Sequence, residues 1–261
     1  MTVPPRPTLW NSERPLILAH RGASAYAPEN TLAAFRLAAE MGADGVELDV
    51  RLSADGVPVV IHDATVGRTT DGYGTVSQLT LTQLQALDAG SWFSPDFAGQ
   101  RLPTLQEVLE VLGDRLLFNV ELKGSSWRDR GLEAAVLAVI EAQGMLDRVL
   151  ISSFDPFALR RMKRLAPRLP VALLYAPDLP LYLRRAWLAP LLPHEVRNPE
   201  HTMVTPKAMA WFRRHRYRVV TWTVDEPEEM RRLARLGVDG IITNRPDVAR
   251  RVLAPSPEAT P

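Results

Sequence analysis

The sequence predicts an α/β fold, a single (βα)8 TIM barrel with a small insertion after the second strand. Short apolar runs alternate with helical patterns along nearly the whole chain, which is typical of parallel strands joined by right-handed crossover helices. The length of 261 residues suits one such barrel, since barrels of this kind are about 250 residues long. No Gly-x-Gly-x-x-Gly motif follows the first apolar run, which disfavours an open dinucleotide-binding sheet.

Each barrel strand is predicted from a short apolar run. A run at residues 57–61 is set aside as a hairpin strand outside the barrel. The barrel strands are then predicted at residues 16–20, 45–50, 116–121, 149–153, 171–175, 195–198, 219–224 and 240–243.

The helices are predicted where apolar residues recur with helical spacing between these runs. The first, at residues 31–41, has Asn30 as its expected N-cap and Gly42 as its end. Segment 179–192 is apolar with two arginines, and a barrel helix is favoured there over a membrane-touching segment. The remaining helices are predicted at residues 105–112, 132–143, 156–165, 181–191, 206–215 and 227–236.

One region, residues 63–102, interrupts the alternation of strands and helices. It is far longer than the usual connection of about 2–6 residues, and long loops are usually functional. We expect an inserted cap, with Trp92, Phe93 and Phe97 forming its own small core. The barrel and insertion together make one predicted domain over residues 1–253. Residues 254–261 contain three prolines and are expected to be a disordered tail.

Composition limits the possible partners. The chain has 31 Lys and Arg against 30 Asp and Glu, a net charge of +1, whereas nucleic-acid binders usually show a basic excess. It has no cysteine, which excludes disulfides, a thiol nucleophile and a cysteine-ligated metal. Residues 1–14 lack an apolar signal core, and no stretch reaches the roughly 18 apolar residues of a membrane span. We expect a cytoplasmic protein with no nucleic-acid partner and no stable membrane insertion.

Three acidic side chains are predicted to point into the barrel. Residues two apart on a strand share a face, so Glu47 and Asp49 lie opposite the apolar face of their run. In the run FNVELK, Asn119, Glu121 and Lys123 share a face in the same way. Burying like charges is costly without a counter-charge, and hard divalent cations prefer oxygen ligands. The pattern favours a divalent metal site over the alternative, a network neutralised by Arg and Lys alone.

Two histidines, His20 and His62, end apolar runs. The C-terminal ends of the strands form the active-site face of a parallel barrel, and imidazoles can act there as acid and base. Arg21 follows His20 and has a planar fork that suits phosphate. The other three histidines, His194, His201 and His215, are predicted to lie on the surface or in loops.

These residues belong to five motifs that follow one another along the chain: His20-Arg21-Gly22, Pro28-Glu29-Asn30-Thr31, Glu47-Leu48-Asp49-Val50, His62-Asp63 and Glu121-Leu122-Lys123. Each motif alone is common. Together, with further matches at residues 68–72, 103–105, 222–224 and 240–247, their order and spacing resemble the glycerophosphodiester phosphodiesterase family. The pair Asn198-Pro199 departs from the family, which often has His-Pro at this place.

The resemblance implies a barrel with the insertion described above and a hydrolase that acts on a small molecule. Its substrate would be a glycerophosphodiester, cleaved to sn-glycerol 3-phosphate and an alcohol. It implies one divalent cation (Mg, Ca or Mn) on Glu47, Asp49 and Glu121. It also implies catalysis by His20 and His62, for which we choose His62 as the acid and His20 as the base.

The resemblance implies further that Arg21 and Lys123 hold the phosphate. Trp222 is expected to pack against the glycerol carbons, and the alternative is that it belongs to the barrel core. Glu29 is expected among the substrate-binding residues, where it supports the site near the metal. Asn30 has two expected roles, to support the site in the same way or to cap the first helix. The nucleophile is either a metal-bound water or hydroxide, or the glycerol hydroxyl adjacent to the phosphate, which would give a transient cyclic phosphate.

Two alternative functions stay open at this stage. The first is a hydrolase of the same barrel type that acts on lysophospholipids, like a lysophospholipase D. The second is a non-catalytic phosphate-binding barrel, which would be expected to lack one of the histidines or carboxylates that this chain retains. The sequence leaves the native ion, the headgroup preference and the oligomeric state open.

Overall fold

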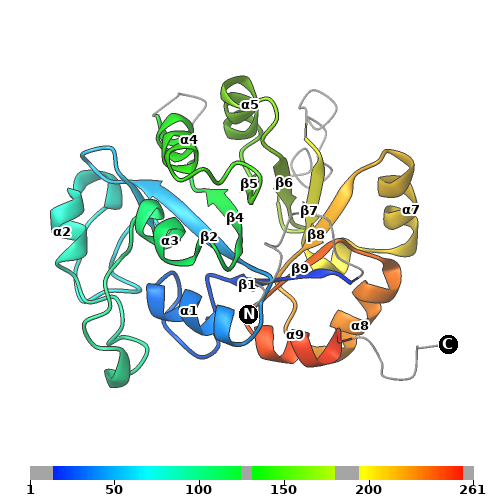
Figure 1. The fold of residues 1–261 in the computed structure, drawn as a ribbon, viewed down its shortest axis with the longest axis horizontal. Helices are drawn as coiled ribbons and strands as arrows, with labels where there is room; N and C mark the ends of the chain where they lie inside the picture. The colour runs from blue at the N-terminus through cyan, green and yellow to red at the C-terminus, as the bar shows by residue number, and fades with distance from the viewer. Residues whose placement is uncertain (1–13, 125–130, 180–193, 255–261) are drawn as a thin grey trace, which may run out of the picture.

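The structure is a computed structural model that describes residues 14–124, 131–179 and 194–254. Its parallel strands close into a barrel (Figure 1), because β1 pairs with β2 on one side and with β9 on the other. The eight barrel strands are β1 (Leu16–His20), β2 (Gly45–Leu52), β4 (Leu117–Leu122), β5 (Val149–Ser153), β6 (Val171–Tyr175), β7 (Val196–Pro199), β8 (Arg218–Thr221) and β9 (Gly240–Thr243). The predicted TIM barrel is confirmed.

Helices follow the strands and surround the barrel (Figure 1). They are α1 (Leu32–Glu40), α3 (Leu105–Leu112), α4 (Leu132–Ala142), α5 (Pro156–Leu165), α7 (Pro206–Arg214), α8 (Pro227–Leu236) and α9 (Pro246–Val252). The sequence interpretation missed α9. The predicted helix at 181–191 and residues 255–261 of the predicted tail lie outside the described residues. Within the described ranges, no helix is long and apolar enough to cross a membrane.

The start of α1 differs from the prediction. Its N-cap is Thr31, whose hydroxyl accepts a hydrogen bond from the backbone N–H of Ala34. Asn30 is not the cap, because it lies one residue earlier in a left-handed conformation, with φ of 58°. Its amide instead turns toward Asp49, so the backbone at this turn directs Asn30 to the mouth of the barrel.

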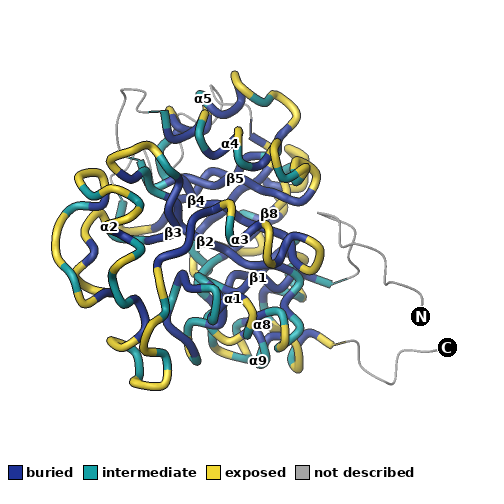
Figure 2. The backbone as a smooth tube through the Cα atoms, turned by 60° about the vertical axis from the view of Figure 1, so that its left-hand side comes forward, coloured by how far each residue is buried: buried dark blue, intermediate teal, exposed yellow. Residues whose placement is uncertain are grey.

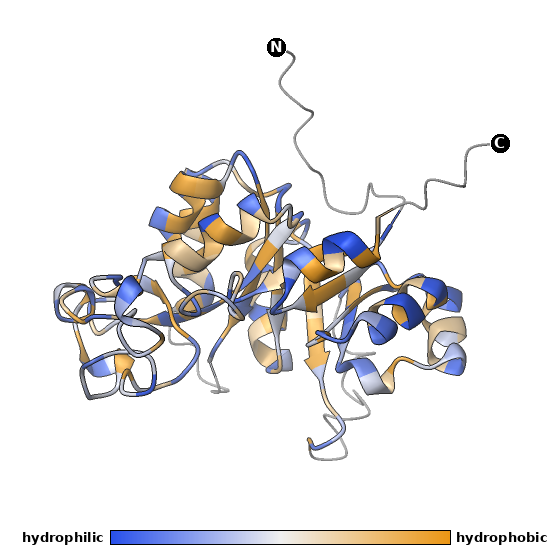
Figure 3. Cartoon of the chain, turned by 90° about the horizontal axis from the view of Figure 1, so that it is seen from below, coloured by the Kyte–Doolittle hydropathy of each residue, from blue (hydrophilic) through white to orange (hydrophobic). Residues whose placement is uncertain are grey.

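Two apolar layers fix the barrel. The larger one lies between strands and helices and includes Ile17, Val46, Leu48 and Val120. The smaller one fills the barrel interior: Leu18, Leu150, Ala172, Val196, Val220 and Ile242. Figure 2 shows the strands as the buried centre, and Figure 3 shows their apolar character. Because side chains alternate along each strand, the next inward residue after Leu18 is His20, so the interior changes from apolar to polar at the mouth.

The insertion follows a hairpin strand, β3 (Pro58–Val60), which pairs antiparallel with β2 as predicted. It contains η1 (Val76–Gln78), α2 (Leu81–Gln85) and η2 (Pro95–Phe97). Its buried core is aliphatic: Val59, Ile61, Val66, Val76, Leu84, Ala89 and Leu102. The prediction of an aromatic core is wrong. Trp92, Phe93 and Phe97 pack edge to face on a loop organised by Asp88, and Trp92 is 41% exposed.

His194 lies in a loop, one of the two places predicted for it, but it is not on the surface. Its side chain is buried, and its ring stacks on that of Tyr217 with 4.9 Å between the centroids. The residue precedes β7, and Tyr217, which follows α7, stacks on it there. It belongs to the packing of the outer layer and not to the barrel mouth.

Candidate active site

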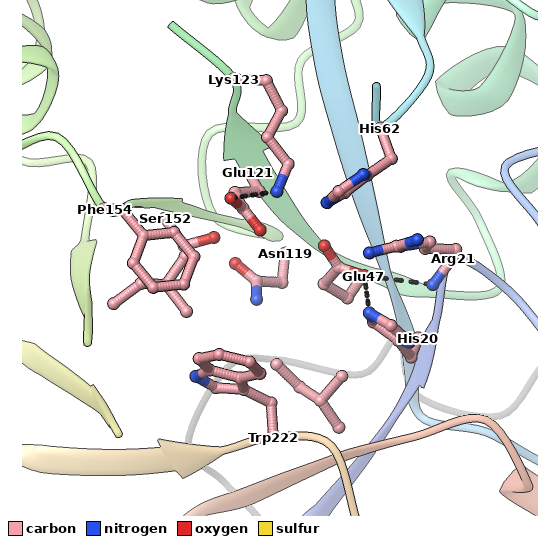
Figure 4. Close-up of a pocket in the computed structure, with 12 residues that line it drawn as sticks. His20, Arg21, Glu47, His62, Asn119, Glu121, Lys123, Ser152, Phe154 and Trp222 are labelled. Atoms are coloured by element: carbon pink, nitrogen blue, oxygen red, sulfur yellow. Dashed lines mark hydrogen bonds and ion pairs between the residues drawn. The ribbon is translucent and has the colours of Figure 1, made fainter. Parts of the chain in front are cut away.

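A cavity of about 180 Å³ opens at the C-terminal ends of the strands. Figure 4 shows that its charged and apolar side chains face one another across the mouth. It is lined by His20, Arg21, Glu47, His62, Asn119, Glu121, Lys123, Ser152, Phe154, Leu174, Trp222 and Ile242. Every predicted site residue except Glu29 and Asp49 therefore lines this one cavity.

The three predicted metal ligands lie together. Glu47 and Asp49 come from β2 and Glu121 from β4, and strand register places Asp49 directly beside Glu121. All three are buried, and each offers a carboxylate oxygen within 4.8 Å of the others. Asp49 is 1% exposed and lies beneath the cavity lining instead of within it.

Asp49 is already well neutralised. Lys123 Nζ is 3.1 Å from its Oδ1, Arg21 Nε is 3.2 Å from its Oδ2, and Asn30 donates a hydrogen bond of 2.9 Å to Oδ2. Burial would raise the pKa of Asp49, but the attraction of Lys123 and Arg21 outweighs it and lowers this pKa to about 2. Asn30 thus contacts a predicted metal ligand directly, as the first of its two expected roles requires.

Glu47 and Glu121 are not neutralised to the same degree. Burial, together with repulsion from Asp49 and Glu121, raises the pKa of Glu47 well above its usual value. Burial also raises the pKa of Glu121 to about 7, although Lys123 Nζ lies 2.5 Å from its Oε1. Two cations thus leave excess negative charge among three oxygen-donor side chains. These residues fit a hard divalent cation, which this charge and donor set favour.

Both histidines have their Nδ1 atoms occupied. His62 Nδ1 lies 2.6 Å from Asp63 Oδ1, and His20 Nδ1 lies 2.7 Å from Asn244 Oδ1. Asp225 accepts from the Asn244 amide, so the Asn244 oxygen faces His20. These acceptors assign the Nδ1 protons and leave each Nε2 for the cavity. Burial lowers the pKa of His20 to about 4 and lowers that of His62 as well.

Arg21 is held at the rim by two acidic groups. Its Nη1 lies 2.8 Å from Glu29 Oε1, while its Nε faces Asp49. Glu29 also accepts hydrogen bonds from both terminal nitrogens of Arg68, at 2.7 and 2.9 Å. Glu29 thus contacts a predicted phosphate ligand without lining the cavity itself.

The opposite wall is apolar. The rings of Trp222 and Phe154 meet edge to face, with 5.6 Å between centroids, and Trp222 Nε1 donates to the Asn198 carbonyl. The sequence interpretation named Trp222 but missed Phe154, Leu174 and Ile242. It also missed Ser152. The alternation of side chains along β5 could have indicated Ser152, and position at the C-terminal end of a strand could have indicated the others.

Comparisons with known proteins agree with this geometry. A model of the Glycerophosphoryl diester phosphodiesterase family matches residues 20–248. The glycerophosphodiester phosphodiesterase of Caldanaerobacter subterraneus is 43% identical over 235 residues, which cover 89% of this chain and 95% of the relative.

Solved structures share the fold. A putative glycerophosphoryl diester phosphodiesterase from Silicibacter pomeroyi has a TM-score of 0.81 at 31% identity, covering 94% of this chain and 93% of its own. An Oleispira antarctica phosphodiesterase in complex with the product sn-glycerol-3-phosphate has a TM-score of 0.82 at 32% identity, covering 92% and 96%. The resemblance read from the motifs is confirmed, and the chain belongs to the glycerophosphoryl diester phosphodiesterase family.

Proposed function

We propose that the chain hydrolyses glycerophosphodiesters to sn-glycerol 3-phosphate and an alcohol in the cavity described above. The observation that carries the proposal is the arrangement of two histidines and two cations around three buried carboxylates at one barrel mouth. The product complex of the Oleispira antarctica phosphodiesterase supports the same chemistry. The substrate is a small molecule, in keeping with the size of the cavity.

Glu47, Asp49 and Glu121 would hold one divalent cation, with Mg, Mn and Ca as candidates because all three take oxygen ligands. When bound, the cation supplies positive charge that offsets the negative charge of the phosphodiester and of its transition state. Arg21 and Lys123 line the same cavity and bind the phosphate oxygens through charge-assisted hydrogen bonds. Trp222 packs against the glycerol carbons.

We assign His20 as the base and His62 as the acid. His20 is neutral near pH 7, because burial lowers its pKa to about 4, so its Nε2 can accept the proton of the nucleophile. Burial lowers the pKa of His62, but the charge of Asp49 and the hydrogen bond to the Asp63 carboxylate oppose that shift and favour the protonated imidazole that an acid needs. The P–O bond to the alcohol breaks as His62 gives its proton to the leaving alkoxide.

Two nucleophiles suit this assignment, a water molecule and the glycerol hydroxyl adjacent to the phosphate. Attack by the hydroxyl gives a cyclic glycerophosphate, which a second step hydrolyses. A quenched time course in ¹⁸O-labelled water separates them. Cyclic product that rises and decays supports the hydroxyl, and its absence with direct label incorporation supports water.

The activity is tested on chelated protein that is reloaded with Mg, Mn or Ca in turn. Glycerophosphocholine, glycerophosphoethanolamine and a lysophosphatidylcholine are assayed side by side. We expect sn-glycerol 3-phosphate from the two soluble diesters only with an added divalent ion. Full activity after exhaustive chelation would refute the metal site, and preference for the lysolipid would favour the lysophospholipase D-like alternative. The cytoplasmic location stays a prediction from the sequence.

A further inference from the structure

Arg68 lies in the insertion, and its guanidinium reaches back to the mouth of the barrel. Its Nε donates to Asp63 Oδ2 at 2.6 Å, and its two terminal nitrogens donate to the two oxygens of Glu29 at 2.9 and 2.7 Å. These contacts use the guanidinium fork in the bidentate geometry that distinguishes Arg from Lys. One side chain therefore joins two carboxylates that come from different parts of the chain.

Each of these carboxylates holds a residue of the cavity. Asp63 Oδ1 lies 2.6 Å from His62 Nδ1, so its other oxygen is the one that Arg68 binds. Glu29 Oε1 lies 2.8 Å from Arg21 Nη1. An unbroken series of contacts thus runs from His62 through Asp63, Arg68 and Glu29 to Arg21.

The electrostatic effects agree with this geometry. The hydrogen bond from Arg68 is the main reason why the pKa of Asp63 falls to about 2. Burial alone would raise the pKa of Glu29, but hydrogen bonds from Arg68 and Arg21 lower it. Both carboxylates therefore stay ionised and keep their acceptor oxygens for His62 and Arg21.

We propose that Arg68 is a positioning residue, which fixes the general acid His62 and the phosphate ligand Arg21 relative to each other. The inference rests on the roles assigned to His62 and Arg21 under the proposed function. It also gives the insertion a task in catalysis that its aliphatic core alone does not explain.

A purely structural role accounts less well for these contacts. The Arg68 side chain is 45% exposed, and ion pairs at such exposed positions contribute little to folding stability. Asp63 is also part-exposed, at 30%. The hydrogen bonds of Arg68 are short, and they hold the carboxylates of Asp63 and Glu29, which contact His62 and Arg21.

The test uses the leaving group. A choline alkoxide needs a proton as it departs, whereas p-nitrophenolate departs as a stable anion. Wild type, Arg68→Ala and His62→Ala are therefore assayed on glycerophosphocholine and on the p-nitrophenyl ester of glycerol 3-phosphate. We expect Arg68→Ala to lower kcat on the choline ester by about 10- to 100-fold, less than the roughly 10²- to 10⁴-fold cost of losing a general acid, because His62 is displaced but still present. The fall on the nitrophenyl ester should be several times smaller.

The second signature concerns Arg21. Because both substrates carry the same phosphate, Arg68→Ala should raise KM on both by a similar factor. Arg68→Lys keeps the charge but not the fork, so we expect it to restore only part of kcat. Arg101→Ala, which removes an exposed arginine of the same insertion, is the matched control and should leave both kcat and KM unchanged. Thermal unfolding of each variant checks that the fold is intact.

The outcomes separate the two levels of the proposal. Equal losses on both esters for Arg68→Ala, while His62→Ala still discriminates between them, would overturn the role of Arg68 and leave the acid assignment standing. Equal losses for His62→Ala as well would overturn the acid assignment and, with it, the positioning of that acid. Wild-type activity of Arg68→Ala on both esters would overturn the inference outright.

Discussion

The two sides of the barrel mouth differ in kind. Strands β1, β2 and β4 bring or precede ionisable side chains at the mouth, including Glu47, Glu121 and Lys123. Strands β5, β6, β8 and β9 bring or precede Phe154, Leu174, Trp222 and Ile242. One side concentrates like charges at a cost in folding free energy, and the other packs as an ordinary core would. The difference supports the proposal that the charged side makes and breaks bonds while the apolar side binds the carbon skeleton.

The largest expected effect comes from the charged side. Glu47→Gln replaces one of the three proposed carboxylate ligands by a neutral amide of the same shape, so we expect kcat/KM to fall by at least about a thousandfold, the scale of several kcal/mol that a metal ion supplies to a transition state. The measurement is hydrolysis of glycerophosphocholine at saturating divalent ion, with calorimetric titration of the ion itself. Activity within tenfold of wild type, with ion affinity unchanged, would remove Glu47 from the site.

The apolar side should respond differently to a change of similar size. Trp222→Ala deletes a ring that packs on Phe154, and the loss of apolar contact area is worth about 1.5–3 kcal/mol. We expect kcat/KM to fall by roughly 10- to 100-fold, mainly through KM, because these contacts hold ground state and transition state alike. Steady-state kinetics measures the split. A fall in kcat alone, with KM unchanged, would place Trp222 among the groups that act on the reacting atoms.

The same contrast explains what could be predicted from the sequence. Glu47, Glu121 and Lys123 are conspicuous because charge on the inward face of a strand has no place in a core. Phe154 and Leu174 carry no such signal, since an apolar side chain at the mouth looks the same in sequence as one in the barrel floor. The eight strands followed from alternation, but the conformation of Asn30 depends on a backbone turn that residue type alone does not determine.

The charge imbalance should also be visible in stability without metal. Burial raises the pKa of Glu121 to about 7, so between pH 4.5 and 7 the folded chain binds a proton that the unfolded chain has lost. The stability of the chelated wild type is therefore penalised as pH rises through this window. Glu121→Gln cannot ionise, so it escapes this loss. The difference between its free energy of unfolding and that of wild type should grow in favour of the variant by roughly 1–3 kcal/mol from pH 4.5 to pH 8.

Urea unfolding in excess chelator at several pH values measures this gap. Leu174→Val, on the apolar side, is the control, because it changes no titratable group and its gap from wild type should not vary with pH. A constant gap for Glu121→Gln would mean that Lys123 neutralises the carboxylate fully, and the excess charge inferred for the site would then be wrong.

The smallest effect on stability is expected at Ser152, which lies at the seam between the two sides next to a serine with different surroundings. Within the described part of the chain, the buried Ser152 hydroxyl has no hydrogen-bond partner and lines the cavity. The Ser153 hydroxyl donates to the Leu122 carbonyl and accepts from the Asp155 N–H.

Ser153→Ala should therefore lower the free energy of unfolding by about 1–3 kcal/mol, since it leaves buried partners unsatisfied. Ser152→Ala should change it by less than about 0.5 kcal/mol or raise it, because it removes an unpaired hydroxyl, while lowering kcat/KM several-fold. A stability loss at Ser152 equal to that at Ser153 would show that its hydroxyl serves the fold and not the substrate.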